Sequence, residues 1–128
     1  MVGSAQAAAC PTAQVEVRFA PGSTGLSQRS REILDGISKI ARSARTGGAP
    51  QIFMKSETDL TGDHRFNERL AKRRGLAVQH YLEAQQLRGI GYTIEIPYPP
   101  IVEAEFRVPD AARRHVIVQL NPQCRSYM

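Results

Sequence analysis

Short stretches in which hydrophobic and polar residues alternate predict the β-strands of this chain. In the segment 13–19 every second side chain is apolar, which is typical of a strand buried on one face. The segment 51–57 contains an apolar trio and is expected to be a central strand, and alternation returns in segments 92–96 and 115–120. The segment 101–109 also alternates, so it is either an extended excursion or an edge strand.

A period close to 3.6 residues predicts the first of two amphipathic helices. It begins after Ser27, a suitable N-cap, runs for about 18 residues and ends at Gly47-Gly48. Gly36 lies inside it, where it costs about 1 kcal/mol relative to alanine and indicates close packing. The predicted inward positions are Ile33, Leu34, Ile37, Ile40, Ala41 and Ala44.

The second predicted helix has two polar residues on its apolar face. Asp63 is its expected N-cap, and it runs to about Ala84. One face of this helix collects Asn67, Leu70, Ala71, Arg74, Val78 and Leu82. Asn67 and Arg74 each need a partner or an opening to water there. A polar turn around Asp59 directly precedes the helix, and an acid beside an inward-leaning arginine is suited to hold a zwitterion.

The element order strand, helix, strand, helix, strand, strand predicts an α+β fold, a two-layer sandwich with both helices on one face of the sheet. We expect residues 1–12 to be disordered, residues 13–122 to form one domain, and residues 123–128 to be a tail. A length of 128 residues with 41% hydrophobic content suits one such domain.

Charge and apolar run length restrict the classes of function. A net charge of +5 favours anionic partners. No run approaches the ~18 apolar residues of a membrane span. The start of the chain lacks the basic segment and apolar centre of a signal peptide, and Ala7 stands where a lipoprotein signal usually has leucine before Cys10.

Cys10 and Cys124 are the two cysteines. From spacing alone they are either unrelated thiols or a staple between the chain ends.

No residue set points to catalysis, a metal or a cofactor. His64, His80 and His115 lack metal-ligand spacing with the cysteines and are interpreted as surface or edge residues. Glu57 and Asp59 are more typical of loop acids than of a catalytic pair. We expect a binding protein rather than an enzyme.

Two motifs in register resemble a known family. The turn reads Thr58-Asp59-x-x-Gly62, and the helix reads Asn67-x-x-Leu70-Ala71-x-x-Arg74-Gly75-x-x-Val78-x-x-x-Leu82. This combination resembles the peptidoglycan-binding signature of the OmpA-like C-terminal domain family. The similarity extends over roughly residues 15–120 and is weakest after Ile96.

The resemblance implies a fold, a ligand and a site. The fold is a mixed four-stranded sheet in the order 1-4-2-3. The ligand is the diaminopimelate of the peptidoglycan stem peptide, whose ammonium Asp59 and whose carboxylate Arg74 would hold. Thr58, Leu60 and Thr61 complete the site, the last two with backbone N–H groups, and Asn67 braces the loop by bonding its backbone.

The resemblance also implies a disulfide and a location. Strands one and four are neighbours in the family, so Cys10 and Cys124 would lie at the same end and form a disulfide. The chain would lie in the periplasm or cell envelope of a Gram-negative bacterium, with or without an outer-membrane association. The parent assembly stays open among an outer-membrane tether, a flagellar stator, a secretion system and a free protein, and envelope proteins are candidate partners.

Three departures from the family pattern define the alternatives. Ser56-Glu57 replaces Gly-His and adds a negative charge, Ala20 replaces an acid, and His115 replaces an arginine. Glu57 and Ala20 motivate the first alternative, an OmpA-like domain that has lost wall binding and serves in protein–protein interaction. The second is a cytoplasmic nucleic-acid binder with reduced cysteines. It is disfavoured because the basic cluster Arg69, Lys72, Arg73 and Arg74 lacks interleaved aromatic residues and reads as a solvated face.

Overall fold

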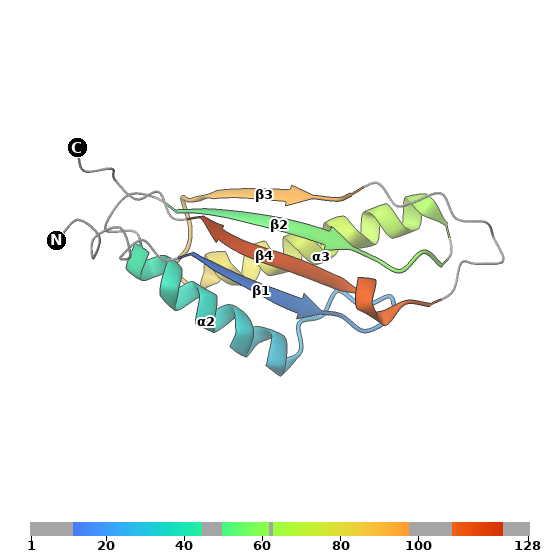
Figure 1. Cartoon of the computed structure of the whole chain (residues 1–128), viewed down its shortest axis with the longest axis horizontal. Helices are drawn as coiled ribbons and strands as arrows, with labels where there is room; N and C mark the ends of the chain where they lie inside the picture. Colours follow the sequence, from blue (N-terminus) through green and yellow to red (C-terminus); the bar gives the residue numbers. More distant parts are fainter. Residues whose placement is uncertain (1–11, 45–49, 62, 98–108, 122–128) are drawn as a thin grey trace, which may run out of the picture.

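A computed structural model describes residues 12–44, 50–61, 63–97 and 109–121. These residues form a four-stranded sheet and two long helices, with a short 3-10 helix before β4 (Figure 1). In chain order the elements are β1 (Ala13–Arg18), α2 (Gln28–Ala44), β2 (Gln51–Glu57), α3 (His64–Ala84), β3 (Gly91–Glu95), η3 (Ala111–Arg113) and β4 (His115–Asn121). The predicted α+β class is confirmed.

The sheet has the predicted order 1-4-2-3, which the structure gives as β1-β4-β2-β3. β4 runs antiparallel to both of its neighbours, whereas β2 and β3 are parallel. The segment 51–57 is thus central, as expected. The register pairs Arg18 with His115 and His115 with Glu57. The end of β1, the start of β4 and the end of β2 therefore lie side by side.

Both helices begin at the caps that the sequence predicts. The Ser27 hydroxyl accepts a hydrogen bond from the amide of Ser30 at 3.1 Å, and the Asp63 carboxylate accepts one from the amide of Phe66 at 3.1 Å. These bonds satisfy amide groups that the first turn of a helix leaves without a backbone partner. The start of α3 is therefore fixed directly after the loop that contains Asp59.

A single apolar core lies between the sheet and the helices. Strands β1, β2 and β4 contribute buried side chains to it, and β3 packs the partly buried Tyr92 and Ile94 against it. Side chains at alternating positions face the core because successive residues of a strand point to opposite faces. Its buried members are Val17, Phe19, Leu34, Ile37, Ala41, Ile52, Met54, Val78, Leu82, Leu87, Ile90, Val116, Val118 and Leu120.

Two predicted features of α2 are wrong. Ile40, which periodicity predicts on the inward face, is 37% exposed, because the buried stripe of α2 is centred on Leu34, Ile37 and Ala41 and includes Ser38. Ile40 immediately precedes Ala41, and one residue turns a helix by about 100°, which carries Ile40 to the edge of the stripe. Gly36 does not mark close packing, since a Cβ there would meet no atom within 4 Å.

Close packing occurs instead at Gly75 of α3. A Cβ on Gly75 would lie 2.7 Å from Cγ2 of Ile94 on β3. The absence of a side chain at Gly75 therefore lets α3 approach the edge strand of the sheet.

Several predictions concern residues outside the described ranges. Cys10 and Cys124 are among them, so their disulfide stays a prediction. Residues 101–108 and most of the predicted terminal segments also lie outside. Within the described residues, no helix combines the length and the apolar character that a membrane crossing requires.

Candidate functional site

The predicted site residues meet at one end of the sheet. The last residues of β1 and β2, the first residues of β4 and the N-terminal half of α3 all converge there (Figure 1). The β1–α2 loop and the β2–α3 loop leave the sheet at this end. Arg74 donates to carbonyls of the first loop and to that of Glu57, the last residue of β2.

Arg74 is the polar centre of this end. Its side chain is fully buried, at 0% exposure. Nε donates to the Ser23 carbonyl at 2.9 Å, and one Nη donates to the Ala20 carbonyl at 3.0 Å. The other Nη reaches the Glu57 carbonyl at 3.5 Å. Arg74 therefore ties the β1–α2 loop to the end of β2 from within the core.

Burial and neighbouring charges act on Arg74 in opposite directions. Desolvation lowers the pKa of the Arg74 guanidinium, with a smaller lowering contribution from Arg114, whereas the negative charge of Asp59 raises this pKa. The guanidinium also lies 5.1 Å from the ring centroid of Phe19, a cation–π arrangement. The carbonyl bonds, Phe19 and Asp59 together stabilise a charge that burial alone would disfavour.

The loop that carries Asp59 is held at several points. Nδ2 of Asn67 donates to the Thr61 carbonyl at 2.8 Å, which confirms the bracing role predicted for Asn67. The Thr61 hydroxyl donates to Oδ1 of Asp59 at 3.4 Å, and Nε of Arg113 donates to the Thr58 carbonyl at 3.0 Å. The Asn67 amide lies on the apolar face of α3, and the Thr61 carbonyl is the hydrogen-bond partner that it requires there.

Asp59 has a charged partner that the sequence did not reveal. Nε of Arg114 donates to Oδ2 of Asp59 at 3.0 Å, and both side chains are 14% exposed. Arg114 lies between η3 and β4, far from Asp59 in the chain. Only the antiparallel pairing of β2 with β4 brings them together, so no local signal in the sequence identifies this pair.

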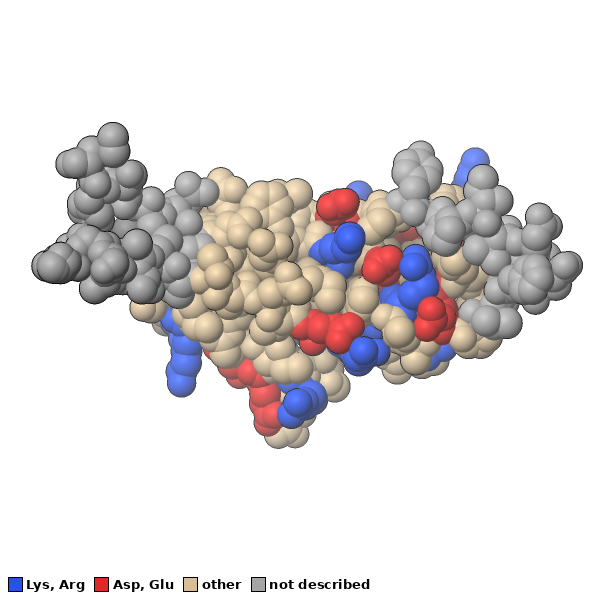
Figure 2. Space-filling model, viewed as in Figure 1, with Lys and Arg blue, Asp and Glu red and all other residues tan. Residues whose placement is uncertain are grey.

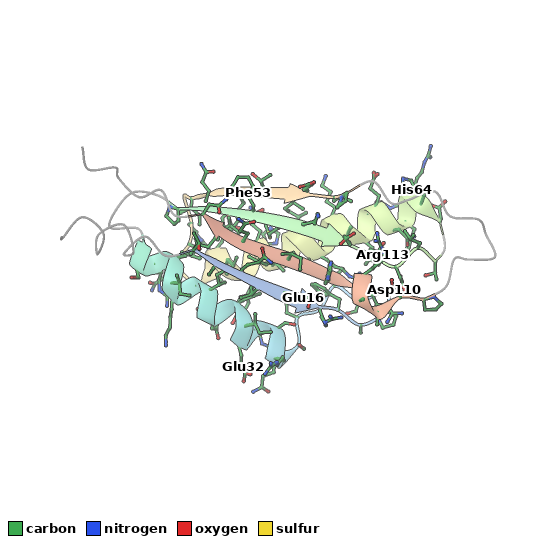
Figure 3. All side chains as sticks on the ribbon, viewed as in Figure 1. Glu16, Glu32, Phe53, His64, Asp110 and Arg113 are labelled. Atoms are coloured by element: carbon green, nitrogen blue, oxygen red, sulfur yellow. The ribbon has the colours of Figure 1, made fainter. Side chains whose placement is uncertain are left out.

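A second charge cluster occupies the open face of the sheet next to Asp59. His115 places Nδ1 2.6 Å from a Glu16 oxygen and Nε2 2.9 Å from a Glu57 oxygen. The other Glu57 oxygen lies 3.2 Å from Arg113. Glu16 and Arg113 are labelled on this face in Figure 3. Figure 2 shows acidic and basic side chains interleaved over the same area.

This cluster corrects two interpretations of the sequence. His115 is not a free surface or edge residue, because β4 is an inner strand and both ring nitrogens have carboxylate partners. Glu57 does not leave an uncompensated charge beside Asp59, because Arg113 forms an ion pair with its carboxylate, which also bonds to Nε2 of His115. Ser56, which with Glu57 replaces the Gly-His of the family pattern, is buried, and its hydroxyl donates to the Ala71 carbonyl at 2.6 Å.

The site combines charge and loop geometry suited to binding. Asp59 and Arg74 lie close enough to interact electrostatically, and the loop Thr58–Thr61 lies at the start of α3. In the part of the chain that the structure describes, no group of three or more His, Cys, Asp or Glu residues is arranged to hold a metal ion. The geometry is that of an acid and a guanidinium held on a rigid support.

Comparison with known proteins identifies the family. The profile of the OmpA family matches residues 18–95, which include Asp59 and Arg74. No curated protein sequence matches the chain at a significant level.

Solved structures with the same fold are distant in sequence. The OmpA-like domain of FopA1 from Francisella tularensis subsp. tularensis SCHU S4 has a TM-score of 0.66 at 13% identity, over 91% of this chain and 77% of that one. The peptidoglycan-associated lipoprotein from Burkholderia pseudomallei has a TM-score of 0.65 at 16% identity, with coverages of 83% and 89%. The cell wall anchor of the T6SS from Pseudomonas aeruginosa has a TM-score of 0.55 at 21% identity, with coverages of 87% and 82%. The family profile and the shared fold together establish that this chain belongs to the OmpA family.

Proposed function

We propose that this chain binds peptidoglycan without covalent chemistry, through the diaminopimelate of the stem peptide, and so anchors itself or its assembly to the cell wall. The observation that carries the proposal is the juxtaposition of Asp59 and Arg74, in which the carboxylate acts electrostatically on a buried guanidinium. The side-chain end of diaminopimelate carries one ammonium and one carboxylate, which an acid and an arginine complement.

Asp59 is the acceptor for the ligand ammonium in this proposal. Oδ1 of Asp59 has only a long bond from Thr61, whereas Oδ2 accepts from Arg114. A carboxylate offers about four lone-pair sites, so an ammonium can bind Oδ1 beside the existing bonds. Arg114 shares this carboxylate and therefore competes with the ligand ammonium for its negative charge.

Arg74 supplies the charge that attracts the ligand carboxylate. A guanidinium has five N–H groups, and three of those on Arg74 donate to carbonyls. Because Arg74 is fully buried, direct contact with a ligand requires the β1–α2 loop to move aside and expose the guanidinium. The backbone amides of Leu60 and Thr61, in the loop before α3, are further donors for the ligand carboxylate in this proposal.

Two relatives of known fold support this assignment by name. One is called a peptidoglycan-associated lipoprotein and another a cell wall anchor of a secretion system. A protein with the proposed activity works in the periplasm of a Gram-negative bacterium, alone or as part of an envelope assembly.

Sedimentation with purified diaminopimelate-type peptidoglycan tests the proposal. The native chain should sediment with the polymer, whereas Asp59→Asn should stay in the supernatant. Glu32→Gln is the matched control, because it removes the same charge from an exposed residue of α2. Equal sedimentation of Asp59→Asn and Glu32→Gln would refute a specific role for Asp59, and a native chain that does not sediment would refute wall binding.

A second candidate function follows from the closed state of the site. Asp59 is paired with Arg114, and Arg74 is fully buried with its bonds directed at backbone carbonyls. The same contacts suit an OmpA-like domain that uses these residues only to stabilise its loops and acts in protein–protein interaction. Under this alternative, the native chain does not bind peptidoglycan, and the one effect of Asp59→Asn is a lower free energy of unfolding.

A further inference from the structure

We propose that a hollow on the flank of α3 is a second subsite, which binds a further carboxylate of the same stem peptide. This inference rests on the proposed function and extends it. The hollow has a volume of ≈ 180 Å³ and is partly open to solvent. It is lined by Gly22, Thr24, Phe66, Arg69, Leu70 and Arg73.

One stripe of α3 forms a wall that is both apolar and cationic. Phe66, Arg69, Leu70 and Arg73 follow the spacing i, i+3, i+4 and i+7, so their side chains share one side of the helix. Leu70 is buried at the base, whereas the Phe66 ring is 51% exposed. An exposed phenyl group beside two guanidinium groups suits a ligand that has both a carbon chain and a negative charge.

Neither cation of this wall has an acidic partner among the residues that the structure describes. The two acids nearest in sequence are engaged elsewhere. Asp63 caps α3 by accepting from the amide of Phe66, and Glu68 faces His64 at 3.9 Å. Arg69 and Arg73 therefore present an uncompensated positive charge to the hollow, and a carboxylate is the ligand that a guanidinium binds with two parallel hydrogen bonds.

The opposite wall connects the hollow to the Asp59–Arg74 site. Gly22 and Thr24 belong to the β1–α2 loop, and the same loop offers the carbonyls of Ala20 and Ser23 to Arg74. Gly22 has a φ of +66° and no side chain, so the loop turns there without filling the hollow. A ligand in the hollow thus contacts the segment whose carbonyl bonds control access to Arg74.

The chemistry of the stem peptide supplies a suitable second anion. Next to the diamino acid lies a glutamate joined through its side chain, which leaves its α-carboxylate free. We assign this α-carboxylate to Arg69 and Arg73. The subsite then distinguishes a stem peptide with a free carboxylate from one in which the group is a carboxamide.

Calorimetric titration with two synthetic tripeptides, alanyl-γ-glutamyl-diaminopimelate with the α-carboxylate free or amidated, tests the subsite. The native chain should bind the free acid about fivefold more tightly than the amide. Arg69→Gln/Arg73→Gln should bind both peptides equally. The matched control is Arg65→Gln/Lys72→Gln, which removes the same charge from exposed residues of α3 outside the hollow and should keep the preference.

The possible results separate the subsite from the proposed function. Equal binding of both peptides by the native chain refutes the subsite and leaves peptidoglycan binding intact. If Arg65→Gln/Lys72→Gln also loses the preference for the free acid, the subsite is refuted, because the net charge of the chain then accounts for that preference. No binding of either peptide by the native chain refutes both proposals together.

Discussion

Nε of Arg114 donates to Oδ2 of Asp59 across 3.0 Å, and this bond joins the start of β4 to the loop before α3. The two charges are mostly shielded from solvent, so their attraction is stronger than that of an exposed pair. Any ligand ammonium that binds Asp59 has to share the carboxylate with Arg114. The pair therefore sets both the rigidity of the loop and the affinity of the proposed site.

Replacing Arg114 separates its effect on the stability of the loop from its effect on ligand affinity. Arg114→Gln should lower the free energy of unfolding by about 1 kcal/mol, because one hydrogen bond to a charged group is lost. It should also strengthen sedimentation with peptidoglycan, because Asp59 then has no competing cation at Oδ2. Arg18→Gln removes an exposed partner of Glu16 at the same end and serves as the control. Weaker sedimentation of Arg114→Gln would instead identify Arg114 as a ligand donor.

Arg74 should be needed for the fold itself. Arg74→Met keeps much of the buried volume but removes the Arg74 donor from the Ser23 carbonyl and one of two donors from the Ala20 carbonyl, which also accepts from the Ser23 amide. We expect a loss of about 3 kcal/mol in the free energy of unfolding, measured by urea denaturation. Arg73→Met, on the exposed neighbour, should change stability by less than about 0.5 kcal/mol. Equal stabilities of the two variants would contradict the structural role of Arg74.

Two glycines in helices should respond oppositely to the same change. Gly36→Ala meets open space and should stabilise by about 1 kcal/mol through helix propensity. Gly75→Ala places its Cβ 2.7 Å from Cγ2 of Ile94, a branch that cannot swing away. Overpacking of about 1–3 kcal/mol should outweigh the propensity gain and make this variant less stable. Thermal unfolding of both variants measures the difference, and a stabilised Gly75→Ala would contradict the close approach of α3 to β3.

A hydrogen bond between the helices should make stability depend on alkaline pH. The Tyr81 hydroxyl donates to Asp35 at 2.7 Å, and this bond raises the pKa of Tyr81 above its ordinary value of 10.0. The folded state therefore keeps the proton longer than the unfolded state. The stabilisation that this hydrogen bond contributes is complete below pH 10.0 and is lost as the pH rises through the pKa of Tyr81 in the folded state. The stability difference between the native chain and Tyr81→Phe should shrink in that window, and a constant difference would contradict the bond.

The fold follows from local patterns, which explains why most of it is predictable. Alternation gives the strand faces, and Ser27 and Asp63 give the helix starts because capping depends on a few adjacent residues. The sheet order came from the family resemblance, not from periodicity. The exposure of Ile40 was missed because periodicity gives the direction of a buried stripe but not its width.

The site is less predictable because its contacts join distant segments. The motif identifies Asp59, Arg74 and Asn67, and the bracing bond of Asn67 spans only six residues. The pairs Arg114–Asp59 and His115–Glu57 depend on the register between β2 and β4. The carbonyl partners of Arg74 depend on the path of the β1–α2 loop, which no side-chain pattern encodes.

Titration with stem peptides that differ only in the diamino acid tests the central claim most directly. Lysine has the side-chain ammonium but lacks the neighbouring carboxylate of diaminopimelate. If Asp59 and the charge of Arg74 hold the two ends of that group, the native chain should bind the diaminopimelate peptide at least about tenfold more tightly than the lysine peptide. Equal affinity for the two peptides, or no binding of either, would contradict the account.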